Sequence, residues 1–319
     1  MKRIVLAMDF GDASVEALRY AAALAQTRGA ALEIAHVVPD PAEEPWSDEL
    51  SVLTTGDITE RWLRNAQARL RALARQYRPL RVDVAVRLGS VAHQLLEHLA
   101  DSHPDLVAIG IANAEHAQLP TIGLIAERLL RKAPCPVLAV PASHGESANG
   151  ALTGPWPRNI LVATDFSAPA RGALPCAWDL AQQTDAVVQV LHVNDTLWNE
   201  GPVCGSEHVN AIDEVKRQLE DEIAAEQTRS GMRRLTYPLL ASGEPAREIL
   251  ACADRIAADV IVMGTHGRSQ VGRFLLGSVT QEVLEHTVRP VLVTGPANEG
   301  GHHVGSYHTS HRGLRLSGV

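Results

Sequence analysis

The sequence has few cysteines and contains neither a disulfide framework nor a zinc motif. Its four cysteines lie far apart and form no CxxC pair: Cys135, Cys176, Cys204 and Cys252. Such usage is typical of a reducing compartment. No apolar run approaches the ~20 residues that cross a bilayer, and the apolar stretch before Asp9 is too short for a secretory signal. We therefore expect a cytoplasmic protein that does not associate with membranes.

Basic residues are in deficit. The chain has 29 Lys and Arg against 37 Asp and Glu, a net charge of −8, and both halves are acidic. Binding to nucleic acid independent of its sequence needs clustered Lys and Arg, so we expect no nucleic-acid partner. A hydrophobic content of 45% is enough to build ordinary globular cores.

Catalytic signatures are also missing. The chain has no GxxxxGK[ST] phosphate loop, no GxGxxG fingerprint, no HExxH helix and no GxSxG elbow. Gly272 and Gly277 have the phosphate-loop spacing, but Ser278 follows without the lysine. Because no nucleophile with a paired acid and base is evident, we expect no catalytic residues and no enzyme. Slow hydrolysis of a bound nucleotide stays open as an alternative.

The chain contains an internal repeat of about 155 residues, which is too long for a solenoid unit and indicates a duplicated domain. Four apolar segments recur: 4–10 at 160–166, 32–37 at 188–193, 105–110 at 259–264, and 136–140 at 290–294. We expect domains at 1–141 and 158–295, a linker at 142–157 and a flexible tail at 296–319. The tail histidines (His302, His303, His308 and His311) lack a fixed scaffold, so we expect no metal site there.

Short apolar runs alternate with amphipathic stretches within each copy. In the second copy we expect strands near 159–164, 187–193, 233–240, 260–264 and 290–294, and helices near 168–183, 207–230, 244–257 and 277–287. The strands are apolar on both faces, as in parallel sheets covered by helices on both sides. The sequence therefore predicts two α/β domains in tandem, each a doubly wound five-stranded parallel sheet.

The connection after the fourth strand of the second copy carries the clearest signal. Gly264 ends the strand, Gly267 permits close approach of the backbone, and Gly277 precedes the next helix. Amide groups at a helix N-terminus favour phosphate, the Ser278 hydroxyl adds a donor, and Arg268 supplies positive charge. A glycine-rich turn that only shapes the chain is the alternative interpretation.

The pattern Gly264-x2-Gly267-x9-Gly277-Ser278, with Asp165 at the end of the first strand, resembles the ATP-binding universal stress protein family. The match covers nearly all of 158–294, and 2–140 resembles the same family more weakly. The whole chain is thus similar to the tandem members of the family. The resemblance implies a Rossmann-like fold of the adenine nucleotide alpha hydrolase type. Enzymes related to that fold carry HxGH-type or SGGxDS-type motifs, and neither occurs here.

The resemblance also implies a ligand and its binding residues. ATP would be bound, with a divalent ion such as Mg²⁺ or Mn²⁺. The implied contacts are Asp165 with the adenosine, the Val193 backbone with the adenine edge, Met263 and Gly264 with the nucleoside, and Gly267, Gly277, Ser278 and Val279 with ribose and phosphates. Capping of the following helix is the alternative role for Asp165.

The corresponding connection of the first copy departs from this pattern. Asn113 replaces Gly267, Leu124 replaces Ser278, and Glu115 adds a negative charge. Lost donors and charge repulsion weaken phosphate binding. We expect the second domain to bind ATP and the first to bind it poorly or not at all.

Three functions remain open at this stage. The first is a stress-response protein that acts as a nucleotide-regulated binding or signalling module with an unknown protein partner. The second is a slow metal-dependent ATPase that uses Arg268, and the third is a scaffold or carrier whose first domain takes an apolar ligand. The resemblance further implies that the final strands, 136–140 and 290–294, pair as an intramolecular pseudo-dimer, with a homodimer also open.

Overall fold

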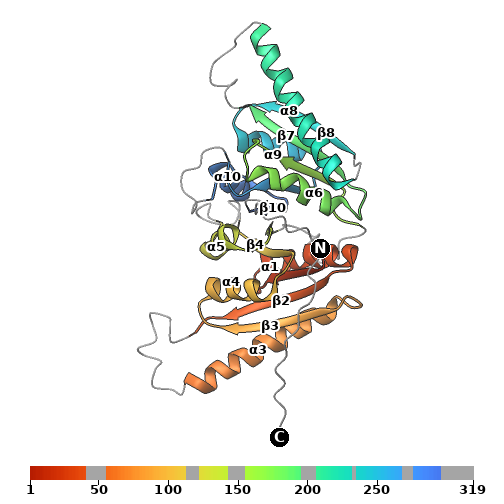
Figure 1. Ribbon diagram of the computed structural model, residues 1–319. Helices are drawn as coiled ribbons and strands as arrows, with labels where there is room; N and C mark the ends of the chain where they lie inside the picture. Colours follow the sequence, from red (N-terminus) through yellow and green to blue (C-terminus); the bar gives the residue numbers. More distant parts are fainter. Residues whose placement is uncertain are drawn as a thin grey trace, which may run out of the picture.

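The computed structural model describes residues 1–40, 55–112, 122–142, 155–194, 206–231, 235–267 and 276–295. Figure 1 shows the N-terminal copy in red to yellow and the C-terminal copy in green to blue, stacked along one molecule. The elements of the first copy are β1 (Arg3–Ala7), α1 (Asp12–Arg28), β2 (Ala31–Val38), α3 (Thr55–Gln76), β3 (Val82–Leu88), α4 (Val91–Ser102), β4 (Leu106–Ile111), α5 (Leu124–Lys132) and β5 (Val137–Pro141).

The second copy repeats this order. Its elements are β6 (Asn159–Ala163), the 3-10 helix η3 (Ala170–Gly172), α6 (Ala173–Ala181), β7 (Val187–Asn194), α8 (Ser206–Ser230), β8 (Thr236–Ser242), α9 (Pro245–Arg255), β9 (Val260–Gly264), α10 (Ser278–His286) and β10 (Val291–Thr294). The alternation of strands and helices expected from the sequence is confirmed. The helix expected at 168–183 is shorter, because the segment with Pro169 and Gly172 forms a 3-10 turn before α6 begins.

The strands form one ten-stranded sheet in the order β3-β2-β1-β4-β5-β10-β9-β6-β7-β8. Neighbouring strands are parallel except at the centre, where β5 and β10 pair antiparallel with Leu138 opposite Leu292. Within its own copy, each of these two strands would be an edge strand with unpaired backbone groups. Their pairing satisfies those groups in both copies.

Helices cover both faces of the sheet, and each face has an apolar core that runs through both copies. On one face, α1, α3, α6 and α8 contribute Leu18, Leu70, Trp178 and Leu219. On the other, α4, α5, α9 and α10 contribute Leu95, Leu129, Ile249 and Val283. Successive strand residues alternate between these two cores, which explains why the strands are apolar throughout.

Two local features at the ends of β1 and β6 show how closely the copies match. Phe10 and Phe166 both adopt a left-handed backbone, with φ of 67° and 65°. Their rings lie against His36 and His192, at centroid distances of 4.8 and 4.5 Å. This conformation is unusual for a bulky residue, so its recurrence in the structure supports the duplication inferred from the sequence.

The segment expected to be a linker takes part in the core at its C-terminal end. Trp156 is 6% exposed, and its ring meets that of Tyr20 edge-on at 5.0 Å. Residues 143–154 lie outside the described part of the chain.

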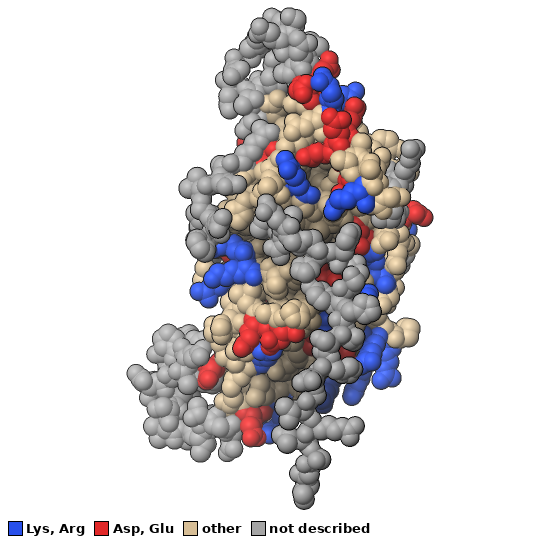
Figure 2. Space-filling view, in the orientation of Figure 1, with Lys and Arg blue, Asp and Glu red and all other residues tan. Residues whose placement is uncertain are grey.

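The described helices include no segment with the length and hydrophobicity of a membrane span. Basic and acidic side chains are interspersed on the face seen in Figure 2.

Candidate functional site

The candidate site lies at the carboxyl ends of β6, β7 and β9, where a doubly wound sheet binds its ligands. Asp165 follows β6, and its Oδ1 accepts a hydrogen bond from the Ser167 amide at 3.0 Å. The Ser167 hydroxyl in turn accepts from the Ala170 amide at 3.3 Å. Asp165 therefore closes a local turn ahead of η3. The alternative weighed from the sequence, capping of the following helix by Asp165, is not seen, because Pro169 and Gly172 are the N-cap residues of η3 and α6 and neither helix start has a side-chain cap bond.

The other carboxylate oxygen of Asp165 faces Gly267. A Cβ atom at position 267 would lie 2.7 Å from Asp165 Oδ2, closer than real side chains allow. A side chain at 267 would therefore force Asp165 or the connection after β9 to shift, and glycine lets the two lie in contact. Gly264 has a different reason to be glycine: its Cβ would lie 3.0 Å from backbone atoms of Pro169 and Ala170, so it allows β9 to pack against η3.

Two hydrogen bonds join the described ends of the connection between β9 and α10. The Gly277 amide donates to the Thr265 carbonyl at 2.8 Å. The buried Thr280 hydroxyl donates to the Gly264 carbonyl, also at 2.8 Å. Gly277 is the N-cap residue of α10 and its own amide is bonded, so it is not among the free amides expected at this helix start. In an α-helix, the amides that follow the cap have no intrahelical partner, so the donors for an anion are those of Ser278 and Val279.

Apolar residues assigned to the site pack on one face of the sheet. Met263 is 4% exposed at the end of β9, and it belongs to the same core cluster that Val193 of β7 and Val279 of α10 pack against. One apolar core thus holds Val193, Met263 and Val279, each of which the resemblance implies as a contact of the nucleotide. Of the predicted residues, Arg268 lies outside the described part of the chain.

The structure adds a residue that the sequence reasoning did not assign. His266 lies between Thr265 and Gly267, and its Nδ1 is 2.9 Å from the Thr265 hydroxyl. Its Nε2 is buried without a hydrogen-bond partner among the described residues. A buried polar atom of this kind is costly unless it is satisfied, and its position between two assigned glycines was the signal that could have found it.

Charged groups near Asp165 come from the face of the sheet that α6 and α8 cover. Burial raises the pKa of Glu222 on α8, the Arg171 charge lowers it, and the Asp165 charge raises it. The thiols of the described residues offer no activated nucleophile, because burial raises the pKa of Cys135 and Cys176 to about 12 and also raises the pKa of Cys252. Within the described residues, no group of three His, Cys, Asp or Glu side chains could hold a metal ion.

The corresponding region of the first copy shares the turn but not the helix start. Asp9 Oδ1 accepts from the Gly11 amide at 2.8 Å, as Asp165 does from Ser167. Gly123, the N-cap of α5, has a φ of +89°, whereas Gly277 has a φ of −62°. Ala126 stands where Thr280 makes its hydrogen bond. Asn113 and Glu115, two of the departures noted in the sequence, lie outside the described residues.

Fold and family model together define the class of protein. The model described as "Universal stress protein family" matches residues 1–141 and again 157–295. The chain therefore belongs to the universal stress protein family, and the two matches make it a tandem member. The resemblance noted in the sequence is confirmed.

The relatives include proteins as long as this chain and proteins of about half its length. Universal stress protein MT2698 of Mycobacterium tuberculosis is 24% identical over 305 residues, which cover 91% of this chain and 95% of that protein. Universal stress protein YxiE of Bacillus subtilis is 31% identical over 144 residues, 42% of this chain and 96% of its own length. This chain is therefore about as long as MT2698 and about twice as long as YxiE.

Solved structures agree on the fold. A universal stress protein from Archaeoglobus fulgidus matches with a TM-score of 0.65 at 21% identity, covering 92% of this chain and 96% of that one. The protein PA1789 from Pseudomonas aeruginosa matches with a TM-score of 0.58 at 18% identity, covering 93% of both chains. The α/β fold class expected from the sequence is confirmed.

Proposed function

We propose that the C-terminal copy binds an adenine nucleotide, ATP by preference, and that the chain acts as a nucleotide-regulated binding module in the stress response. One observation carries the proposal: an apolar face, a carboxylate and a helix N-terminus lie together at the carboxyl ends of the strands of the second copy. Val193, Met263 and Val279 supply the face, and Asp165 lies against Gly267 beside it. An adenine needs an apolar slot with a few backbone partners, and a triphosphate needs amide donors.

The donors present also suit a divalent ion carried by the nucleotide. Mg²⁺ and Mn²⁺ prefer oxygen ligands, and Mg²⁺ is usually held by one or two protein groups plus phosphates and water. The half-buried Asp165 carboxylate and the exposed Ser278 hydroxyl are such groups at this edge. The ion would neutralise phosphate charge beside Asp165, while the protein holds the nucleoside through its apolar face.

The proposed role is binding rather than catalysis. The described thiols are protonated at neutral pH, and the carboxylate near the phosphate region is engaged in a turn. A nucleotide held at the β9–α10 connection would change the surface that a protein partner meets there, which gives the nucleotide a regulatory role through differential binding. We expect the first copy to contribute little to nucleotide affinity.

The test is to identify released ligands by mass spectrometry and to titrate the nucleotide-free full-length chain with ATP and Mg²⁺ by calorimetry. We expect one ATP per chain and no release of inorganic phosphate. Gly277→Glu should weaken binding by about 100-fold or more, since a carboxylate would face the phosphates. The matched variant is Gly123→Glu, at the corresponding N-cap of the first copy. A side chain is strained at its φ of +89°, so this variant should lose stability but leave the ATP affinity unchanged.

A milder variant protects this test against a folding defect. A Cβ at 277 would lie 3.2 Å from the Thr265 carbonyl oxygen and from His266 Cα, so the glutamate variant requires a small shift. Ser278→Ala removes only an exposed hydroxyl and should weaken ATP binding by about 3- to 10-fold. Thermal unfolding of each variant reports its integrity. Two equivalent ATP sites, or a loss of binding in Gly123→Glu alone, would contradict the proposal.

A further inference from the structure

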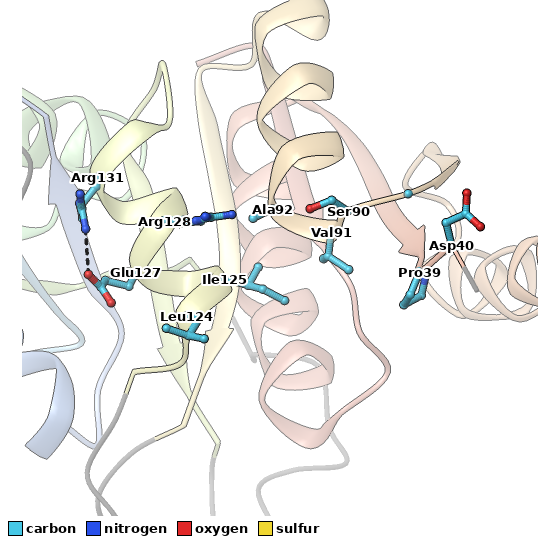
Figure 3. Close-up of a pocket in the computed structure, with 11 residues that line it drawn as sticks. Pro39, Asp40, Ser90, Val91, Ala92, Leu124, Ile125, Glu127, Arg128 and Arg131 are labelled. Carbon is cyan, nitrogen blue, oxygen red and sulfur yellow. Dashed lines mark hydrogen bonds and ion pairs between the residues drawn. The ribbon is translucent and has the colours of Figure 1, made fainter. Parts of the chain in front are cut away.

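A second concave site lies in the first copy, away from the nucleotide site of the second. It is a cleft of about 580 Å³ between α4 and α5, closed at one end by the residues that follow β2. Figure 3 shows α5 on one side of it and the start of α4 on the other. A volume of this size accommodates a small organic ligand. We call it the α4–α5 cleft and define it by Asp40, Ser90, Val91, Leu124, Ile125 and Arg128.

One wall of the α4–α5 cleft is apolar and open to water. Leu124 is 83% exposed and Ile125 is 42% exposed, and they are consecutive at the start of α5. Val91 faces them from the start of α4 (Figure 3). Large aliphatic side chains gathered at the mouth of a cleft indicate a surface that is covered by a ligand. An apolar body is therefore one part of what the cleft would accept.

The other wall offers groups that bind an anion. Arg128 projects from α5 across the cleft toward Ala92 (Figure 3), and it has no ion pair or hydrogen bond with another described residue. Ser90, the N-cap of α4, makes no side-chain bond to the first turn, so the amides that open this 12-residue helix have no side-chain acceptor. Arg131 is paired with Glu127 at 3.0 Å, and Asp40, at the far end, has an interaction of its own.

The second copy has the opposite charges at the corresponding positions. There Glu244 caps α9 by accepting hydrogen bonds from the amides of Ala246 and Arg247, at 3.1 and 2.8 Å. Along α10, Glu282 and Glu285 occupy the positions of Arg128 and Arg131. The first copy thus has no carboxylate at this helix N-terminus and has arginine where the other copy has glutamate. Glu127, where the other copy has Gln281, is neutralised by its ion pair with Arg131. These differences favour a negatively charged ligand in the first copy.

We propose that the α4–α5 cleft binds a small amphipathic anion, an apolar body that ends in a carboxylate or a similar oxyanion. Arg128 and the first-turn amides of α4 hold the anionic group, and Val91, Leu124 and Ile125 cover the apolar body. The scaffold or carrier function weighed from the sequence then has a defined location. This site does not depend on nucleotide binding by the second copy, and either proposal can fail without the other.

The experiment compares two fluorescent probes on the full-length chain. Anilinonaphthalene sulfonate is an amphipathic anion, and N-phenylnaphthylamine is the same molecule without the sulfonate. Arg128→Glu should weaken the sulfonate probe by about 10-fold or more and leave the neutral probe within about 2-fold. The matched control is Arg75→Glu, at a separate hollow between α3 and β3, which should leave both probes unchanged.

Competition then identifies the ligand class. Decanoate and decyl phosphate should displace the part of the signal that depends on Arg128, and the stronger competitor identifies the anionic group. ATP should not displace it, and the Gly277→Glu variant should retain it. An unchanged affinity for the sulfonate probe in Arg128→Glu would overturn the proposal. Equal loss of the neutral probe, displacement by ATP, or failure of both decyl compounds would also do so.

Discussion

The two copies share their cores but differ where polar side chains meet. In the first copy, Arg3 and His98 surround Glu33 on β2, with distances of 2.9 and 3.4 Å to its Oε2. The corresponding residues of the second copy are uncharged: Asn159, Cys252 and Gln189. Strand register and the left-handed phenylalanine turn survived duplication, while charged clusters, helix caps and clefts diverged. Each polar difference can be tested by converting one copy into the other.

The largest expected effect comes from the β5–β10 pairing that joins the copies, which we call the seam. Leu138 is 1% exposed and pairs with Leu292 at the centre of the sheet. Leu138→Asp places a charge there, so we expect unfolding free energy to fall by about 4 kcal/mol or more. X-ray scattering should show an increased radius of gyration as the halves separate. The control Leu240→Asp, on the exposed part of edge strand β8, should cost about 1 kcal/mol or less. A compact, stable Leu138→Asp chain would contradict this role of the seam.

The next effect concerns the charged cluster of the first copy. The neighbouring His98 and then Arg3 hold the pKa of Glu33 at about 2, below its ordinary 4.5. Because the folded pKa is depressed, this stabilisation is complete above about pH 4.5 and is lost as the pH falls toward 2. Glu33→Gln copies Gln189, and it should cost about 3 kcal/mol at pH 7 and little at pH 2.

Urea unfolding at several pH values measures this difference. Glu97, half-exposed on α4, provides the control, and Glu97→Gln should change stability by about 0.5 kcal/mol or less at every pH. A cost of Glu33→Gln that did not depend on pH would show that the carboxylate charge is not responsible.

A third difference is an ion pair between the two copies that has no counterpart at the positions related by the repeat. The Arg28 guanidinium, 3% exposed, lies 2.6 Å from the Asp179 carboxylate of the other copy and also contacts Gln182. The positions related by the repeat are Thr184 and Ala23, which form no ion pair. Asp179→Ala leaves a buried guanidinium with fewer partners and should cost about 2 kcal/mol. The control is Asp83→Ala, at an exposed pair, with a cost of about 0.5 kcal/mol or less in the same chemical denaturation. Equal costs would remove the special role of Arg28.

The smallest effect lies at the proposed nucleotide site. Thr280→Val removes the hydroxyl that bonds the Gly264 carbonyl, and so brings the second copy closer to Ala126 of the first. We expect a loss of about 1 kcal/mol in stability and a decrease of about 3- to 10-fold in ATP affinity. The converse variant, Ala126→Thr, should not create ATP binding. Calorimetry on both variants measures the effect. An unchanged ATP affinity in Thr280→Val would show that the hydrogen bond between Thr280 and Gly264 does not contribute to ligand binding.

Much of the fold could be predicted because apolar strands and their recurrence are local signals. The site was harder to predict, because its geometry depends on contacts between distant residues. Glycine at 267 was recognised, but its cause, the approach of Asp165, appears only in three dimensions. Engagement of the Gly277 amide by Thr265 also follows from tertiary contact, and the sequence reasoning missed it. The shortening of the helix expected at 168–183 had a local cause, Pro169 and Gly172, that was visible in the sequence.

The antiparallel pairing of β5 and β10 has a consequence for how the two sites could evolve. When separate identical chains associate through a strand in this way, symmetry gives both partners the same site, and dilution separates them. Here the partner is carried on the same polypeptide, so the association persists at any protein concentration. A substitution then alters only one half, which leaves each half free to acquire a ligand of its own.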